Sequence, residues 1–306
     1  MITNKQIEEM VGHSKCDDMP YADRESRFLK VKNKYRNSIK APIDVFSENG
    51  YLMLGDVLND EQCESIKKFL MTKTVYNAHV PAYADMECDS FSSFESLPSI
   101  MPSVAPNDLN YYSWSLGDLL ENKDITRLCS NPLLINFAQQ YLGGIPPSLF
   151  TVNAMLNVAG GVDDGLVRTM HRDFDDLRTC SLLVYLTDVN EDSGGSFLIK
   201  EGTHLGVDEG KEVRVYGKKG TGWLVDAYGW HRGTTVNKGH RILLWIRYSI
   251  YDNPTYKDVD KNWLLRADYD TVNEHIDLDN AINKNVFRLV VKDIDNLDYM
   301  NGVSNE

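Results

Sequence analysis

The pattern of apolar and polar positions changes at about residue 148, where short alternating runs separated by turn residues begin. This pattern is typical of a β-sandwich or barrel. Beyond Arg241 the last run is apolar on both faces, so we expect a strand buried on both sides, with Arg241 buried or half-buried at its entry and close to an anion. The predicted strands cover residues 149–157, 180–186, 196–200, 212–216, 222–225 and 241–250.

Three helices are predicted before this β-rich part. The first ends at Gly50 and leads into a strand, and the second begins at a sequence like a capping box at Asn59. The third begins at Asn131, which is followed by proline, and stops at Gly143. Residues 79–114 lie between the last two helices and show no clear periodicity. We interpret them as a loop or lid that shapes a substrate pocket.

Length and polarity indicate one domain with additions. A chain of 306 residues with 42% hydrophobic content can bury one large core. Residues 1–42 are rich in charge and are predicted to form a polar N-terminal arm, with a solvated segment at residues 30–36. Residues 43–306 are predicted to form the domain, with a β-rich core at 148–250. A C-terminal helical extension is expected at 251–306, including a helix around residues 263–276.

Charge and cysteine content exclude several classes of partner. The formal net charge of −13 argues against a nucleic-acid binder, because phosphate backbones are held by clustered basic groups. No run approaches the roughly 20 apolar residues of a membrane span, and the start has no apolar signal core. The five cysteines are widely spaced without a C-x-x-C pair, which indicates reduced thiols. We therefore expect a soluble cytoplasmic protein with a small-molecule partner; the sequence does not indicate an oligomeric state.

The sequence His171-Arg172-Asp173 carries the clearest chemical meaning, together with His231. On an extended segment alternate side chains point the same way, so His171 and Asp173 can hold one ion while Arg172 faces elsewhere. Two imidazoles and one carboxylate are the ligand set of non-haem Fe(II) oxygenases, which leaves coordination positions open. We predict His171, Asp173 and His231 as iron ligands at the catalytic centre. The rival third ligand is His204, which lies in a Gly-Thr-His turn.

Five blocks of sequence share their order and spacing with one family. They are residues 170–173, 183–189, 192–204 and 222–233, followed by Arg241. Together they resemble the phytanoyl-CoA dioxygenase family over about residues 43–250. The resemblance implies a mainly β fold with flanking helices, a double-stranded β-helix of the jelly-roll or cupin-like type. It also implies an enzyme that uses Fe(II), 2-oxoglutarate and O2 to oxidise a substrate while releasing succinate and CO2.

The resemblance also implies how the cosubstrate is held. The planar guanidinium of Arg241 matches a carboxylate in two parallel hydrogen bonds and should bind the far carboxylate of 2-oxoglutarate. Thr234 or Thr235 can add a hydroxyl donor, and Asn157 is a weaker candidate. Arg172 stands where the family usually carries glutamine and is a candidate contact for an acidic or hydroxyl-rich substrate.

We expect a dioxygenase that hydroxylates a small or medium-sized metabolite. Halogenating relatives replace the carboxylate ligand with a small residue, and Asp173 fills that place. Two alternatives remain open: a binding protein that kept the barrel and metal site without turnover, and a cupin-like metalloenzyme that does not use 2-oxoglutarate. Arg241 argues against both, and the substrate stays unidentified.

Overall fold

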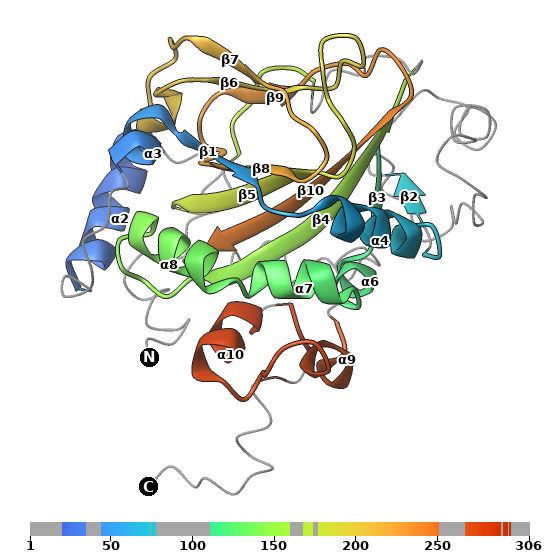
Figure 1. Cartoon of the computed structure of the whole chain (residues 1–306). Helices are drawn as coiled ribbons and strands as arrows, with labels where there is room; N and C mark the ends of the chain where they lie inside the picture. Colours follow the sequence, from blue (N-terminus) through green and yellow to red (C-terminus); the bar gives the residue numbers. More distant parts are fainter. Residues whose placement is uncertain are drawn as a thin grey trace, which may run out of the picture.

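Two facing antiparallel sheets form the centre of the fold in a computed structural model of the chain (Figure 1). The residues described are 20–34, 44–73, 75–77, 111–159, 168–173, 177–250, 267–288, 290–292 and 294. The large sheet has the strand order β1 (Tyr51–Asp56), β8 (Thr221–Val225), β5 (Thr179–Tyr185), β10 (His240–Ser249), β4 (Ser148–Val158), β3 (Tyr111–Trp114) and β2 (Val75–Asn77). The small sheet has the order β7 (Glu212–Val215), β6 (Phe197–Lys200) and β9 (His231–Gly233). The predicted mainly β barrel with flanking helices is confirmed.

Helices cover the outer face of the large sheet (Figure 1). Asn59 caps α4 through a reciprocal capping box with Gln62, as the sequence predicts. Asn131 caps the predicted third helix, which corresponds to α8. The helices are α2 (Tyr21–Lys34), α3 (Asp44–Asn49), α4 (Asp60–Leu70), α6 (Leu116–Leu120), α7 (Lys123–Cys129), α8 (Pro132–Tyr141), α9 (Tyr269–Asn273) and α10 (Ala281–Phe287).

Strand β10 separates two hydrophobic cores. Ile242, Leu244 and Ile246 point into the core beneath the helices. Leu243 points the other way, into a smaller core between the two sheets that includes Trp223. This alternation follows from the period of two along a strand and confirms that β10 is buried on both faces. Arg241 and Arg247 have the parity of Leu243, so both lie on the side that faces the small sheet.

Several elements differ from the sequence prediction. The predicted loop at residues 79–114 ends in strand β3, and its residues 79–110 lie outside the described ranges. The helix expected at residues 263–276 is shorter, because α9 covers Tyr269–Asn273 and α10 follows it. Residues 263–266 are also outside the described part. Strand β9 was not predicted, because a three-residue strand is too short to show alternation.

The predicted polar arm contains helix α2, which packs against the domain. Phe28 is buried, with the Arg178 guanidinium 3.8 Å from its ring centre. Arg24 is also buried and donates a hydrogen bond to the Leu177 carbonyl at 3.1 Å. This packing was not predicted from the sequence, because α2 is held by few apolar side chains and by cation–π contacts. The predicted solvated segment begins inside this helix, and the boundary at residue 42 stays a prediction.

Within the described ranges, no helix is long and apolar enough to cross a membrane.

Candidate metal centre

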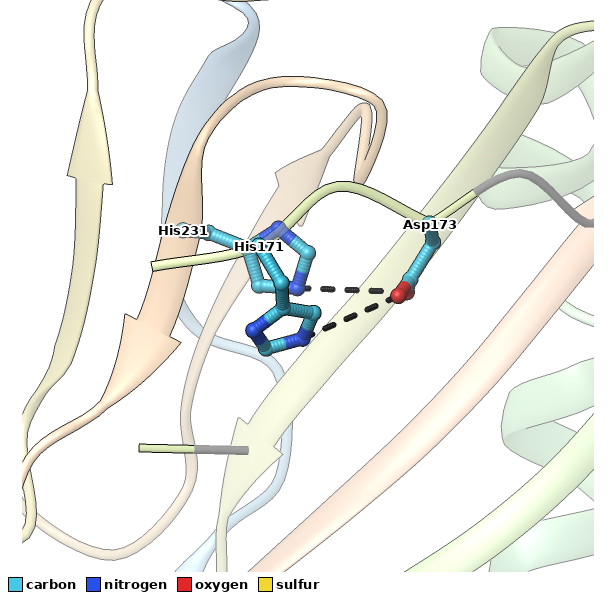
Figure 2. Close-up of side chains that lie close together, drawn as sticks. All are labelled: His171, Asp173 and His231. Carbon is cyan, nitrogen blue, oxygen red and sulfur yellow. Dashed lines mark ion pairs between the residues drawn. The ribbon is translucent and has the colours of Figure 1, made fainter. Parts of the chain in front are cut away.

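Three side chains converge between the two sheets: His171, Asp173 and His231 (Figure 2). His171 Nε2 lies 3.8 Å from Asp173 Oδ1, and His231 Nε2 lies 3.8 Å from Asp173 Oδ2. One potential ligand atom from each residue falls within 4.8 Å of the others. These separations are longer than hydrogen bonds, so the three groups surround a space that suits one ion. The structure thus brings together the three residues that the sequence singled out.

Backbone pairing sets the positions of these side chains. His171 and His231 exchange two backbone hydrogen bonds of 3.0 Å as an antiparallel bridge. Residues directly opposite in such a bridge present their side chains on the same face. The Asp173 backbone N–H donates to the Ala227 carbonyl at 2.9 Å, which fixes the carboxylate two residues beyond His171. Local pairing therefore presents all three groups to the same space.

The hydrogen bonds of the imidazoles leave the correct nitrogens for a metal. His171 Nδ1 lies 2.8 Å from the Thr169 carbonyl, and His231 Nδ1 lies 2.9 Å from the Gly229 carbonyl. A carbonyl can only accept, so each Nδ1 carries the hydrogen and each Nε2 presents its lone pair. Both Nε2 atoms face Asp173. Fixing the tautomer through the second ring nitrogen is the usual arrangement around metal-bound histidine, so the donor set fits a divalent metal.

Arg247 contacts the candidate metal site and was missed by sequence reasoning. Its Nη2 lies 2.6 Å from Asp173 Oδ2, and its side chain is 2% exposed. The guanidinium stacks on the Trp245 ring, 3.9 Å from the ring centre. A buried, stacked guanidinium has little freedom, so it fixes the orientation of the carboxylate. The available signal was parity: Arg247 follows Arg241 by six positions, which places both on one face of β10.

Charges in the centre favour the forms that bind a cation. Burial by itself raises the pKa of Asp173, but the Arg247 guanidinium and the two imidazoles outweigh burial and hold this pKa below its usual value. Burial lowers the pKa of His231, and the opposing attraction of Asp173 does not restore it. Near neutral pH the carboxylate is therefore ionised and His231 is neutral. These are the ligand forms that metal coordination requires.

Arg241 and Asn157 lie next to each other on the side of the large sheet that faces the small sheet. They are direct partners in the pairing of β10 with β4, and both are buried. Arg241 Nη2 donates to Asn157 Oδ1, and Arg241 Nη1 donates to the Gly195 carbonyl at 2.7 Å. Both of these acceptors are neutral oxygens. The strand register therefore places Arg241 beside Asn157, and both were predicted to contact the cosubstrate.

Thr234 does not join this pair. Its hydroxyl lies 3.0 Å from the Ser196 hydroxyl. Both residues line a cavity together with Arg232, the residue that follows His231 in β9. Because neighbours along a strand face opposite sides, Arg232 and Thr234 share the side that His231 does not. Within the described residues Thr234 makes no hydrogen bond to Arg241, and its role at the cosubstrate stays a prediction.

Arg172 and His204 have structural partners. Arg172 donates to the carbonyls of Thr203 at 2.7 Å, Tyr228 at 2.9 Å and Val207 at 2.6 Å. The guanidinium thus ties loops together, its side chain is 6% exposed, and its contact with a substrate stays a prediction. His204 is buried, and its Nε2 lies 2.9 Å from the Ser47 carbonyl. His204 is not part of the group that gathers His171, Asp173 and His231.

A column of stacked side chains links α2 to the H-x-D segment. The Arg24 guanidinium lies 4.0 Å from the centre of the Tyr228 ring, and the Arg172 guanidinium lies 4.8 Å from the same centre. Arg172 is also 4.8 Å from the ring centre of Trp230. Each cation–π contact contributes about 0.5 to 2 kcal/mol, depending on desolvation. Arg172, the residue between two of the potential ligands, is thus joined to helix α2.

No family model matches the chain, and no curated protein matches it. Solved structures that resemble it include SnoK, the non-heme alpha ketoglutarate dependent carbocyclase from nogalamycin biosynthesis, with a TM-score of 0.50 and 14% identity over 74% of this chain and 93% of that chain. The epimerase SnoN from the same biosynthesis has a TM-score of 0.47 and 17% identity, covering 74% and 84%. HygX from Streptomyces hygroscopicus, with nickel, 2-oxoglutarate and hygromycin B bound, has a TM-score of 0.44 and 15% identity, covering 69% and 87%. The likeness to SnoK shows that the fold is a double-stranded β-helix.

Proposed function

We propose that the chain is an Fe(II)- and 2-oxoglutarate-dependent dioxygenase that hydroxylates a small or medium-sized metabolite. The carrying observation is the group of His171, Asp173 and His231, in which both Nε2 lone pairs face an ionised carboxylate. When bound there, Fe(II) with 2-oxoglutarate and O2 supplies the oxidation: one oxygen atom enters a substrate C–H bond, and the other enters succinate as CO2 leaves. SnoK, an alpha ketoglutarate dependent enzyme, has a similar fold, which supports this class.

The proposal gives separate roles to the two inner arginines of β10. Arg247 orients Asp173 so that a carboxylate oxygen faces the metal. Arg241 is proposed to bind the far carboxylate of 2-oxoglutarate, held in place by Asn157 and the Gly195 carbonyl. A buried guanidinium is well suited to this, because its planar donors match a carboxylate. A role for Thr234 at the cosubstrate, membership of the phytanoyl-CoA dioxygenase family and a cytoplasmic location stay predictions.

The function is tested by measuring cosubstrate turnover. Anaerobic Fe(II) plus 2-oxoglutarate should give a weak visible charge-transfer band, and O2 should then yield succinate slowly even without the true substrate. The matched control is Asp173→Ala, which should give neither signal. Iron binding without the band or succinate would favour a non-catalytic barrel. Product formation that does not need 2-oxoglutarate would favour a cupin-like metalloenzyme.

Arg241→Lys should weaken 2-oxoglutarate binding by about tenfold or more and leave Fe(II) affinity nearly unchanged. Lysine keeps the charge but cannot reproduce the two parallel hydrogen bonds, and charge-assisted bonds contribute roughly 1.5 to 3 kcal/mol. Titration of the visible band with 2-oxoglutarate measures the dissociation constant directly. An unchanged constant would mean that the cosubstrate is held elsewhere or is a different acid.

A further inference from the structure

A cavity of about 240 Å³ lies on the outer side of the small sheet, separate from the metal centre. Its position follows from the strand register. Leu198 in β6 pairs with Arg214 of β7 on one side and with Arg232 of β9 on the other. Residues directly opposite one another share a face, and His231 points to the opposite face from Arg232. The cavity and the metal centre therefore lie on opposite faces of β9.

Two arginines in this cavity have hydrogen-bond donors to spare. Arg214 is exposed and makes no hydrogen bond or ion pair within the described part of the chain. Arg232 donates through Nη1 to the Arg168 carbonyl at 3.3 Å, which holds its side chain in place, while its buried Nε has no partner among the described residues. Strands are spaced about 4.8 Å apart, so the two arginines, one strand apart on either side of Leu198, stand about 10 Å apart.

Polar residues lie around the arginines. Tyr216 and Asn237 also line the cavity, and neither side chain makes a hydrogen bond within the ranges that the structure describes. The wall includes Gly194, whose φ is +65°. A Cβ at this position would lie only 2.4 Å from the Thr235 carbonyl oxygen, so only glycine lets the loop come this close to the Thr235 backbone.

The charge of the cavity is opposite to that of the chain. Arg168, Arg214 and Arg232 contribute three positive charges to its lining, and Glu191 contributes one negative charge, which leaves two positive charges. The whole chain has a net charge of −13, so this local excess is not a consequence of composition. Two positive charges complement a dianion, and guanidinium groups bind phosphate and carboxylate oxygens through parallel hydrogen bonds.

We propose that this cavity binds the phosphate group of a small phosphate monoester. Such a group carries a charge of about −1.5 to −2 at pH 7 and has three strong acceptor oxygens, which match the donors of Arg214, Arg232, Tyr216 and Asn237. The volume is below the roughly 300 to 1,000 Å³ of sites for drug-sized ligands, so it favours a compact ester over a nucleotide. The site is independent of the metal and of the proposed oxygenase activity.

Isothermal titration of the full chain with glycerol phosphate at fixed ionic strength tests this site. Wild-type protein should bind glycerol phosphate more tightly than malonate, a dicarboxylate of similar size. Arg214→Gln should weaken glycerol phosphate binding about tenfold, because it removes one charge-assisted contact. Glu191→Gln should strengthen binding several-fold, because it removes the opposing charge. Arg127→Gln is the matched control: Arg127 is an exposed arginine in α7, and its loss should change nothing.

Three results would overturn the proposal. The first is no heat of binding for glycerol phosphate at millimolar concentration. The second is an affinity for glycerol phosphate that is the same in Arg214→Gln and Arg232→Gln as in Arg127→Gln. That result would place the phosphate elsewhere. Malonate binding tighter than phosphate binding would assign the cavity to a carboxylate instead. Arg232→Gln also removes the bond to the Arg168 carbonyl, so thermal melting of each variant must show that the fold is retained.

Discussion

Alanine at His171, Asp173 or His231 should abolish stoichiometric Fe(II) binding and turnover, whereas alanine at His204 should leave both intact. Loss of one ligand in three removes affinity and the three-sided geometry at once. His204 lies outside this group, with its Nε2 directed to the Ser47 carbonyl. Anaerobic reconstitution followed by measurement of bound iron per chain gives the result directly.

The His204 variant is the internal control for this experiment. Its imidazole is buried, so His204→Ala is expected to lower stability by leaving a cavity while iron content stays at one per chain. The three ligand variants should keep the wild-type far-ultraviolet circular dichroism spectrum. If His204→Ala loses iron and His231→Ala retains it, the assignment of the third ligand is wrong.

Arg247→Met should lower Fe(II) affinity at least tenfold and destabilise the metal-free protein by about 3 kcal/mol. Removing one partner of a buried ion pair leaves the other charge uncompensated, which typically costs roughly 3 to 5 kcal/mol. We expect the low end of this range because the Asp173 side chain keeps 19% exposure. Methionine retains much of the packing against Trp245, so the change reports mainly on the lost charge and hydrogen bond.

Because the variant should bind the metal at least tenfold more weakly, saturating metal stabilises it less than the wild type, so the destabilisation by Arg247→Met should grow by about 1.4 kcal/mol or more when the metal is present. Urea unfolding with and without saturating Ni(II), which is not oxidised by air, measures this difference. Arg247→Lys is the matched control and should recover part of the stability, because it restores the charge without the planar donors. Equal destabilisation in both conditions, with unchanged metal affinity, would limit Arg247 to a packing role.

Features with local signals could be predicted from the sequence. The strands from β4 to β8 and β10 show alternation and turn residues, and the start of α4 shows its capping box. The H-x-D pair was recognisable because two residues on an extended segment share a face. Each of these depends on neighbours in the chain, which is why sequence reasoning reached them.

Features that depend on distant pairing could not be predicted. The partner of Arg247 lies 74 residues away, and no local pattern marks it. The side of the sheet that Thr234 faces is set by the pairing of β9 with β6, and β9 is too short to show alternation, so the sequence does not reveal it. Strand β3 was also missed, because its place beside β4 is set by tertiary contact and not by a local pattern.

The column from Arg24 through Tyr228 to Arg172 makes the metal centre a late product of folding. Arg24 also bonds to the Leu177 carbonyl, 153 residues away in the sequence, and closing so long a loop costs entropy before the contact forms. During synthesis α2 emerges long before its partners Leu177, Arg178 and Tyr228 have been made. The metal site is complete only once His231 has been made, so iron binds late, and its binding free energy stabilises the native state alone. Cells short of iron would then accumulate folded but less stable apoprotein, which proteases remove sooner.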